Sequence, residues 1–328
     1  MWDNCSVFLG IDLSSRDVAT VLADENGAAL LALRAARPLQ GGSPAVWHAV
    51  VQTARETLMR GAQQPAQIRR VALAIDAPLD TDGVVLRGIN TDGWEGFDVP
   101  RALREHLGIA DTRAENRVVC EALGEARFGA LRPDGEHSTN EYSGCDWLFV
   151  HVGEHLGAAA RVNGHVLRGD ARAALDIGAI CIERDGELAS SGRRGSLEAY
   201  CGGDNFVTRA ASYGLTLKSA HEIWEMESSN FAARSLCDDY VRRLAQGLGC
   251  ALSILNPRRV VLGGAIALSL GETLLAPLRS GIREFCAPSH SSSVQIVLSQ
   301  LGQDAAVLGA VALALEHDVR HEANLGTG

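Results

Sequence analysis

LGIDLSSRDVATVLADENG, residues 9–27, is the stretch that decides the fold of this chain. With its flanking residues it contains a short apolar segment at 6–11, a second one rich in β-branched residues at 17–23, and a turn at 24–27 that leads into 28–34. Short apolar runs bounded by turn residues are typical of strands. The stretch therefore predicts an antiparallel meander of three strands.

The same strand pattern returns in the second half of the chain. WLFVHV at 147–152 and GAAARV at 157–162 are followed by the hairpin-type turn Asn163-Gly164. The remaining pattern predicts helices at 45–60, 99–107, about 218–254, 271–286 and 304–317, and strands at 70–75, 258–264 and 294–298. We interpret this as two α/β halves of related build, alike in pattern rather than in residues.

Length and charge limit the classes of function. The chain has 328 residues, of which 46% are hydrophobic and 21% charged, as in a globular protein with a sizeable core. Its formal net charge of -10 disfavours broad attraction to nucleic acid or to an anionic membrane surface. The eight cysteines form no C-x-x-C pair, and no segment approaches about 18 apolar residues. We therefore expect reduced thiols, a cytoplasmic location and no membrane span.

Four segments of the chain share their order and spacing with one known family. They are the stretch at 9–27, ENRVVCEALGEARFGA at 115–130, GRRGSLEAY at 192–200 and NPRRVVLGGAI at 256–266. From about residue 7 to about residue 315 the chain resembles the ROK family of sugar kinases and repressors. The second and third segments together make this resemblance specific.

The resemblance implies a duplicated α/β fold of the actin-like, ribonuclease-H-like type, with two domains and a cleft between them. It places residues 1–118 and about 305–328 in the first domain, which the C-terminal helix closes, and residues 119–304 in the second. It also implies a homodimer that binds a small sugar or sugar derivative and, in the kinases of the family, ATP with magnesium.

Both glycine-rich loops that hold phosphate in the family kinases are altered. The first, D-x-G-G-T-K in the family, reads Asp12-Leu13-Ser14-Ser15-Arg16-Asp17, so Asp12 is kept for magnesium while the glycines are lost. Ser14 and Ser15 also fit a second interpretation, in which they simply cap a hairpin. The second loop begins Gly153-Glu154-His155, and a carboxylate at Glu154 repels phosphate unless it turns outward.

The family's catalytic base is replaced as well. Phosphoryl transfer to a sugar hydroxyl needs a carboxylate that accepts the proton. The resemblance supplies it as the aspartate of E-N-D-A-N, where this chain has Glu115-Asn116-Arg117. Arginine stays protonated, so we expect no catalytic residue at this position. Arg117 and Glu121, four residues apart on a predicted helix, also fit an ordinary surface ion pair.

A structural zinc site is also missing. In the zinc-bearing members of the family one histidine and three cysteines bind the metal. The corresponding positions here are Ala179, Ala189, Ser191 and Ser196. The resemblance therefore implies no zinc and no other metal ligand, and the flanking GRRG and LEAY segments indicate that the loop keeps its course by other packing.

Part of the family's sugar site remains. The residues that the resemblance assigns to the substrate are Asn90, Asn116, Arg117, Asp176 and Glu198. Polar side chains that converge beside an aromatic ring suit the recognition of hydroxyl groups. Other interpretations stay open, since Asn116 also fits a helix cap, Glu198 a solvated carboxylate at a helix start, and Trp94 a packing residue.

The nucleotide side is the best preserved. Residues 260–265 resemble the adenosine-side strand and turn of the family, with Gly263 and Gly264 beside Asp12 as the cofactor residues. A strand followed by two glycines and a helix also occurs wherever a helix packs closely on a sheet. The sequence therefore leaves open whether the chain binds ATP with magnesium.

These losses favour a pseudokinase that binds a sugar-like ligand or a partner in a sensing or scaffolding role. The cation at Arg117 predicts an anionic ligand, such as a sugar phosphate or an acidic sugar. The alternative is a divergent ATP-dependent kinase of hexoses or amino sugars, with Asp76 or Asp92 as its base. A transcriptional regulator is disfavoured, because the first family strand begins about seven residues into the chain and leaves no room for a helix-turn-helix.

Overall fold

The computed structural model describes residues 6–88, 91, 93–132 and 145–316. The chain divides into two compact units, Met1–Gly124 with Ala306–Gly328, and Glu125–Ala305. They are called unit 1 and unit 2 below, and each is described by itself. Unit 1 is assembled from both ends of the chain, and the division falls within the helix α3 (Arg117–Phe128).

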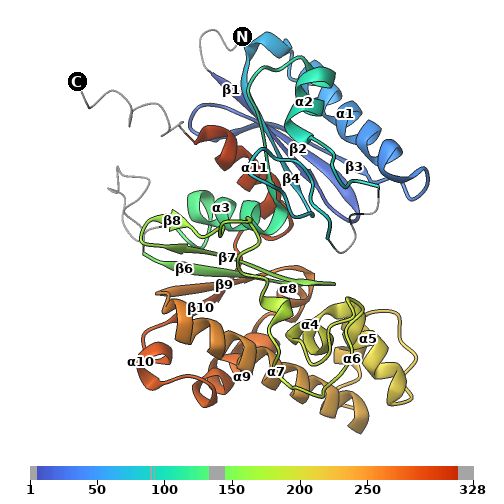
Figure 1. The fold of residues 1–328 in the computed structure, drawn as a ribbon, viewed down its shortest axis with the longest axis vertical. Helices are drawn as coiled ribbons and strands as arrows, with labels where there is room; N and C mark the ends of the chain where they lie inside the picture. Colours follow the sequence, from blue (N-terminus) through green and yellow to red (C-terminus); the bar gives the residue numbers. More distant parts are fainter. Residues whose placement is uncertain (1–5, 89–90, 92, 133–144, 317–328) are drawn as a thin grey trace. The chain divides into compact units, whose positions relative to one another are not determined.

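A mixed sheet, whose strands β1 to β4 are labelled in Figure 1, forms the centre of unit 1. Its strands lie in the order β3-β2-β1-β4-β5. The strands are β1 (Val7–Leu13), β2 (Asp17–Ala23), β3 (Ala29–Ala36), β4 (Ile68–Ile75) and β5 (Thr112–Asn116). The first three pair antiparallel, which confirms the predicted meander, while β4 lies parallel to β1 and β5 parallel to β4. The sequence analysis missed β5, because its segment TRAEN has almost no apolar residues.

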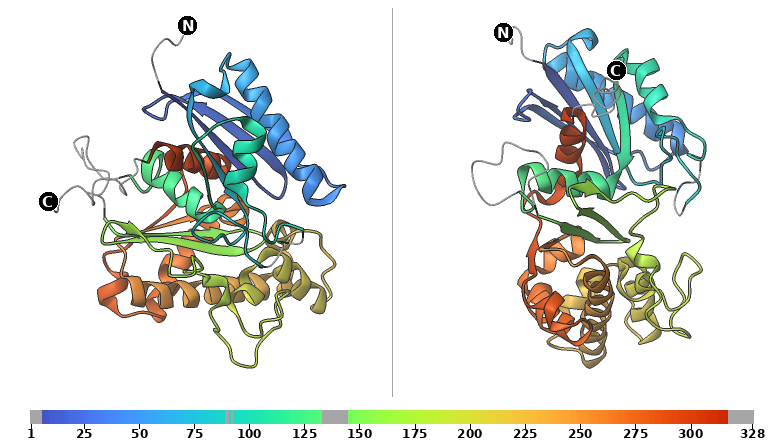
Figure 2. Two further views of the ribbon diagram at one scale, coloured as in Figure 1. Left: turned by 45° about the horizontal axis from the view of Figure 1, so that its top comes forward. Right: turned by 60° about the vertical axis from the view of Figure 1, so that its left-hand side comes forward.

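Helices cover both faces of this sheet (Figure 2). They are α1 (Gly42–Arg60), α2 (Val99–Leu107) and α11 (Ala305–Leu315), with a 3₁₀ turn at Pro65–Gln67. Alternate side chains of β1 point to opposite faces. Leu9 and Ile11 therefore join the core that includes Trp47 of α1, whereas Gly10 packs against Val307 and Val311 of α11.

The sheet of unit 2 repeats this arrangement, in the order β10-β9-β6-β7-β8. Its strands are β6 (Trp147–Val152), β7 (Leu156–Val162), β8 (His165–Val166), β9 (Arg259–Gly263) and β10 (Gln295–Leu298). β6 pairs antiparallel with β7 and parallel with β9, as β1 does with β2 and β4. The two halves of related build that the sequence predicted are thus present.

The helices of unit 2 share one core with its sheet. They are α4 (Leu197–Cys201), α5 (Gly203–Ser212), α6 (Ala220–Glu225), α7 (Phe231–Leu255), α8 (Ala265–Leu270), α9 (Glu272–Gly281) and α10 (Pro288–Ser291), with 3₁₀ turns at Ile177–Ala179, Ile282–Glu284 and Gly302–Asp304. The fully buried Tyr240 and Leu248 of α7 belong to the same core as Leu148 and Val150 of β6. This core fixes α4, which carries one of the site residues.

Two sequence expectations differ in detail from the structure. The helix expected at about 218–254 is two helices, α6 and α7, because Asn230 caps a new helix by accepting a hydrogen bond from the Ala233 N–H at 3.1 Å. The helix expected at 271–286 ends as α9 and continues as a 3₁₀ turn. Among the described residues, no helix is both long and apolar enough to cross a membrane.

Candidate ligand-binding site

The carboxyl ends of neighbouring strands bring the first group of site residues together in unit 1. Asp12 lies near the end of β1, Asp76 directly follows β4, and Asn116 and Arg117 lie where β5 joins α3. Because β1, β4 and β5 are parallel neighbours, these ends lie at one edge of the sheet. Ligands of α/β sheets bind at such edges.

The guanidinium group of Arg117 is paired with two carboxylates of unit 1. Its Nε donates to Asp12 Oδ1 at 2.9 Å, its Nη2 to Asp12 Oδ2 at 3.3 Å, and its Nη1 to Glu121 Oε1 at 2.6 Å. Asp12 is fully buried, Glu121 is 4% exposed, and the Arg117 side chain is 17% exposed. The expected pair of Arg117 with Glu121 is therefore present, but its placement on the surface was wrong, because Asp12 draws the pair into the interior.

Burial and pairing shift the ionisation of this cluster. Burial raises the pKa of the Asp12 carboxyl to about 6, although Arg117 acts to lower it. Burial alone lowers the pKa of the Arg117 guanidinium, but the charges of Glu121 and Asp12 outweigh this effect and hold it above its ordinary value. Arg117 therefore stays protonated, and it cannot accept a proton from a hydroxyl group.

Asn116 joins β5 to α3 through its side chain. Its Oδ1 accepts a hydrogen bond from the Val118 N–H at 2.9 Å, and its Nδ2 donates to the Ala77 carbonyl at 3.1 Å. The first of these bonds is that of a helix cap, which is the second interpretation that the sequence allowed. Both ends of the Asn116 amide are thus bonded to the backbone of unit 1.

The turn between β1 and β2 is closed by Ser14. Its hydroxyl accepts from the N–H groups of Arg16 at 3.1 Å and Asp17 at 3.0 Å, and it donates to Asp17 Oδ1 at 2.7 Å. These bonds match the interpretation of Ser14 as a hairpin cap. Backbone N–H groups that a glycine loop would turn toward a phosphate are bonded within the turn instead.

A second group of site residues lies at the turn between β6 and β7 in unit 2. Glu198 of α4 accepts from the Leu156 N–H at 2.8 Å, and its other oxygen lies 3.0 Å from His155 Nδ1. Glu198 is 8% exposed, so the interpretation as a solvated carboxylate is wrong, while Glu154 in the same turn is exposed. The sequence analysis missed the role of His155, because nothing in the spacing of 155 and 198 marks them as neighbours.

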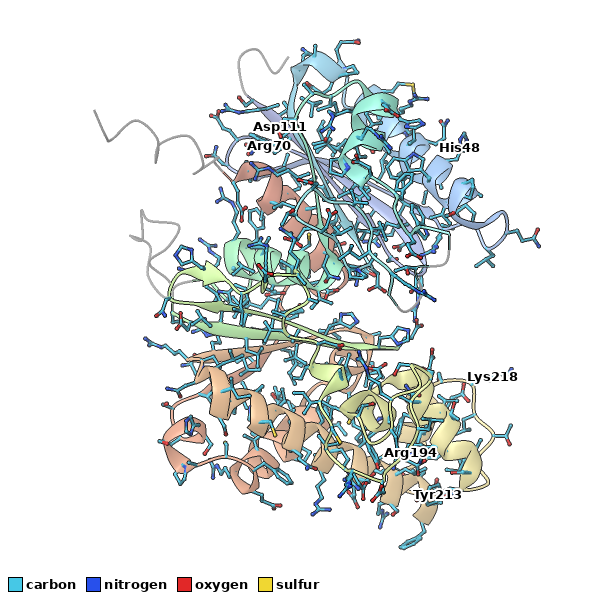
Figure 3. All side chains as sticks on the ribbon, in the orientation of Figure 1. His48, Arg70, Asp111, Arg194, Tyr213 and Lys218 are labelled. Carbon is cyan, nitrogen blue, oxygen red and sulfur yellow. The ribbon has the colours of Figure 1, made fainter. Side chains whose placement is uncertain are left out.

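The loop that resembles the zinc-binding segment lies before α4. Asp176 forms an exposed ion pair with Arg193 at 2.8 Å, and Arg194, labelled in Figure 3, donates to the Gly186 carbonyl at 2.9 Å. Of the four substituted zinc positions, Ala189 is buried and Ser196 caps α4. Among the described residues, no cluster of His, Cys, Asp or Glu side chains has an arrangement that could hold a metal ion.

Tyr200 provides the alternative packing for this loop. Its hydroxyl donates to Glu183 and accepts from the Glu187 N–H at 3.0 Å. Two guanidinium groups lie over its ring, that of Arg209 4.8 Å and that of Arg243 4.5 Å from the ring centroid. Arg243 also pairs with Glu183 at 2.8 Å. These contacts anchor the loop to α4, α5 and α7, as the persistence of its flanking segments had indicated.

The two glycines of the predicted nucleotide turn lie where the backbone requires them. Gly264 has a φ of 88°, and a Cβ there would lie 2.5 Å from the Val152 carbonyl oxygen. A Cβ on Gly263 would lie 2.5 Å from the Phe149 ring. Close packing of β9 and α8 on β6 is therefore a sufficient reason for both glycines.

Two candidates, Asn90 and Asp92, lie outside the described residues. Trp94, which follows them, is 7% exposed and makes edge-on contacts with the rings of Trp47 and Phe97. Trp94 therefore packs in the core of unit 1, as the second interpretation stated.

Taken together, the two mixed sheets of related topology define an α/β protein of the actin-like ATPase type. The model of the ROK family matches residues 8–317 of the chain. The chain therefore belongs to the ROK family.

Similar proteins include sugar kinases and regulators. The chain is 24% identical to a glucokinase of Thermotoga maritima, over 94% of this chain and 97% of the relative. It is 22% identical to a xylose repressor of Bacillus subtilis, over 94% of this chain and 77% of the relative. The ROK hexokinase structure from Thermus thermophilus is similar in fold, with a TM-score of 0.78 at 24% identity over 94% of this chain and 97% of that one.

Proposed function

We propose that this ROK-family chain binds a sugar without efficient phosphoryl transfer, as a pseudokinase with a sensing or scaffolding role. The observation that carries the proposal is the pairing of Arg117 with Asp12 and Glu121. It occurs at the position where the resemblance puts the catalytic aspartate. The relatives of the chain include proteins named as a glucokinase and as a xylose repressor, so their names are not confined to enzymes.

The chemistry of sugar phosphorylation explains why this pairing matters. A carboxylate must accept the hydroxyl proton as the oxygen attacks the phosphoryl group. Arg117 carries no lone pair for this proton, and its cation is neutralised by its neighbours rather than offered to a reacting group. The chain thus has the fold of the family and an arginine at the position where the resemblance puts the proton acceptor.

The residues on the phosphate side do not fit a magnesium–ATP group. Both carboxylate oxygens of Asp12 accept hydrogen bonds from Arg117, which leaves the carboxylate a poor magnesium ligand. The turn at Ser14 is closed on itself, and the exposed Glu154 places a negative charge in the second loop. Gly263 and Gly264 are explained by packing. We therefore derive no step through ATP.

The pairing of Arg117 with Asp12 and Glu121 also bears on the charge of the ligand. The sequence predicted an anionic ligand held by Arg117, but three of the five N–H donors of the guanidinium group are bonded to Asp12 and Glu121, whose two carboxylates already balance its charge. An additional anion would have to compete with two carboxylates that are 0% and 4% exposed. We therefore propose a neutral sugar as the ligand.

One observation favours the alternative of a divergent sugar kinase. Asp76 is exposed at the end of β4, and its negative charge acts on Arg117 across the same strand edge. A carboxylate in this place is a candidate base for a sugar hydroxyl. Several relatives of the chain are named as glucokinases, which keeps this alternative worth testing.

A coupled assay of ADP release separates the two functions. It uses the native chain, Asp76→Asn and the control Asp82→Asn, which changes an exposed acid in the next turn. The substrates are a panel of neutral hexoses and amino sugars with ATP and magnesium. We expect no release above the enzyme-free rate for any of the three proteins.

Turnover by the native chain that Asp76→Asn abolishes and Asp82→Asn preserves would overturn the pseudokinase proposal and establish the kinase. Turnover that survives both substitutions would overturn it too, with a base elsewhere. Calorimetric titration of the same sugars tests binding without catalysis. Absence of heat for every sugar in the panel would remove the sugar-binding part of the proposal.

A further inference from the structure

Arg161, near the end of β7, is a buried arginine in the sheet of unit 2. The residue is 8% exposed, and among the described residues its Nε and Nη2 atoms have no hydrogen-bond partner. The ion pairs that the described part of the chain forms do not include Arg161 either. A buried charge without a carboxylate beside it costs free energy, which an anion bound to it recovers.

The two nitrogens without a partner lie on one edge of the guanidinium group. The N–H bonds of Nε and Nη2 are parallel there, and they fit two oxygens of one carboxylate or phosphate group. Two other arginines of the chain bind a carboxylate with this same edge. Nε and Nη2 of Arg117 donate to the two oxygens of Asp12 at 2.9 and 3.3 Å. Those of Arg70 lie 2.6 and 2.5 Å from Oδ2 of Asp111, a pair labelled in Figure 3.

A third donor without a partner lies beside Arg161. Trp147 of β6 is the Cα partner of Arg161 in the antiparallel pair of β6 and β7, so both side chains point to the same face of the sheet, with Cβ atoms about 5 Å apart. Trp147 is 1% exposed, and no described residue accepts a hydrogen bond from its indole N–H. Guanidinium and indole groups donate and cannot accept, so a ligand that satisfies both must be an acceptor.

A second arginine lies in the same row of the sheet. Trp147 is also the Cα partner of Arg259 in β9, so the indole group lies in a row between two arginines. Arg259 donates to two neutral oxygens, the Ala130 carbonyl and Gln295 Oε1, both at 2.9 Å. Its cation adds to the positive potential of this row. Charge and hydrogen bonding therefore both favour an anion here.

This row lies away from the turn that carries the second group of site residues. Trp147 is the first residue of β6, whereas that turn begins at Gly153, beyond the other end of the strand. At the usual rise per residue the strand separates the two places by about 20 Å. The row of Arg161 and Trp147 is therefore distinct from the surroundings of Glu198.

We propose that Arg161 and Trp147 form a binding site for a small oxyanion. Nε and Nη2 of Arg161 hold two oxygens of one phosphate or carboxylate group, and the indole N–H of Trp147 donates to the same group. The anion supplies the negative charge for the buried guanidinium group and links β6 to β7 through side chains. This site does not depend on the proposed sugar-binding function, and a failure of that function leaves it unaffected.

Proton–nitrogen NMR of the indole groups in the full chain tests the site. Inorganic phosphate and acetate are titrated at neutral pH, each against chloride at the same ionic strength. The Trp147 resonance is assigned as the one that is missing in Trp147→Phe. It should shift in a saturable way with at least one of the two anions, because the indole N–H gains an acceptor. The anion that binds more tightly identifies the ligand group as a phosphate or a carboxylate.

Arg161→Met tests the part of the guanidinium group in the same titration. It removes the charge and the fork of donors, so the affinity for the preferred anion should fall about tenfold or more. The control Arg184→Met removes an exposed guanidinium group of unit 2 and should leave the affinity unchanged.

Thermal unfolding separates anion binding from a structural role of Arg161. In chloride alone, Arg161→Met should melt no lower than the native chain, because it removes a buried charge that has no carboxylate beside it. The preferred anion should raise the melting temperature of the native chain and of Arg184→Met, and should leave that of Arg161→Met unchanged.

Three results would overturn the proposal. The first is a Trp147 resonance that neither phosphate nor acetate shifts, and the second is an Arg161→Met variant that binds the anion as tightly as the native chain. The third is a melting temperature of Arg161→Met in chloride clearly below that of the native chain, since Arg161 would then stabilise the fold without an anion.

Discussion

In unit 1 the charged residues Asp12, Arg117 and Glu121 pair with one another in the interior, whereas in unit 2 the buried carboxylate of Glu198 lies beside the partly exposed imidazole of His155. Asp12, Arg117 and Glu121 form a closed ion-pair cluster, of which the most accessible side chain is 17% exposed. Glu198 and His155 form a pair whose outer member is 38% exposed. The two sheets repeat one topology, but the paired residues lie at different places in it, because Arg117 begins the helix after β5 whereas Glu198 lies on α4, between β8 and β9.

The largest expected effect on stability comes from breaking the ion-pair cluster of Asp12, Arg117 and Glu121 in unit 1. Arg117→Ala should lower the free energy of unfolding by about 3–5 kcal/mol, because it leaves the carboxylates of Asp12 and Glu121 buried without a cation. Urea unfolding followed by circular dichroism measures the change. The control Arg101→Ala removes a guanidinium that is 64% exposed and should change stability by no more than about 0.5 kcal/mol. A loss below about 1 kcal/mol for Arg117→Ala would mean that the cluster is not closed.

The next effect is the dependence of stability on pH. Asp12 has a pKa of about 6 in the folded chain against 3.8 as its ordinary value, because of burial. The folded state therefore binds more protons between these values, and the contribution of Asp12 falls as pH rises from about 4 to about 6. The free energy of unfolding of the native chain relative to Asp12→Asn should fall by about 2–3 kcal/mol over this range.

Asp17 provides a control for which the contribution to stability should depend on pH in the opposite direction. The hydrogen bond from Ser14 and the pairing with Arg34 outweigh burial and lower the pKa of the Asp17 carboxyl. Its contribution to stability is present above the ordinary pKa of the group and is lost as pH falls. Stability measured against Asp17→Asn should therefore rise with pH in acid. The same sign for both variants would contradict the assignment of Asp12.

The smallest expected effect on stability comes from removing the hydroxyl group of Tyr200 in unit 2. Tyr200→Phe should lower the free energy of unfolding by about 1–2 kcal/mol, because Glu183 and the Glu187 N–H lose their hydrogen-bond partner. Thermal unfolding measures it, with Tyr213→Phe as the control. The Tyr213 ring, labelled in Figure 3, is 54% exposed and should contribute nothing measurable.

The effect of a chelator on the melting temperature is a second test of what holds this loop. Because Tyr200 and its neighbours brace the loop in place of zinc ligands, EDTA should leave the melting temperature of the native chain unchanged. A clear fall in melting temperature with EDTA, restored by added zinc, would show that a metal and not Tyr200 braces the loop.

Local patterns predicted much of the fold and part of the site. The meander at 6–34 and its return at 147–166 were readable because alternating apolar residues and turn residues act over short distances. The pair of Arg117 and Glu121 was readable because residues four apart on a helix are neighbours. The caps at Asn116 and Ser14 were open alternatives for the same reason, and the structure decided between them.

The rest depended on residues that are distant along the chain. Asp12 and Arg117 are 105 positions apart, and His155 and Glu198 are 43 apart. Each pair is brought together by sheet pairing and core packing, which no local pattern encodes. For this reason, the interior placement of the ion pair and the pairing of His155 with Glu198 could not be predicted from spacing.

The sequence by itself determined that a cation follows Asn116, that serines follow Leu13, that a carboxylate follows Gly153, and that alanine or serine stands at 179, 189, 191 and 196, since these are matters of residue identity. Only the tertiary structure decided what the remaining groups do. In the folded chain Arg117 pairs with Asp12 and Glu121, and Glu198 pairs with His155. The physical reason is that the charge of a side chain belongs to its residue type, whereas its partners and its burial are fixed only when the distant strands and helices pack.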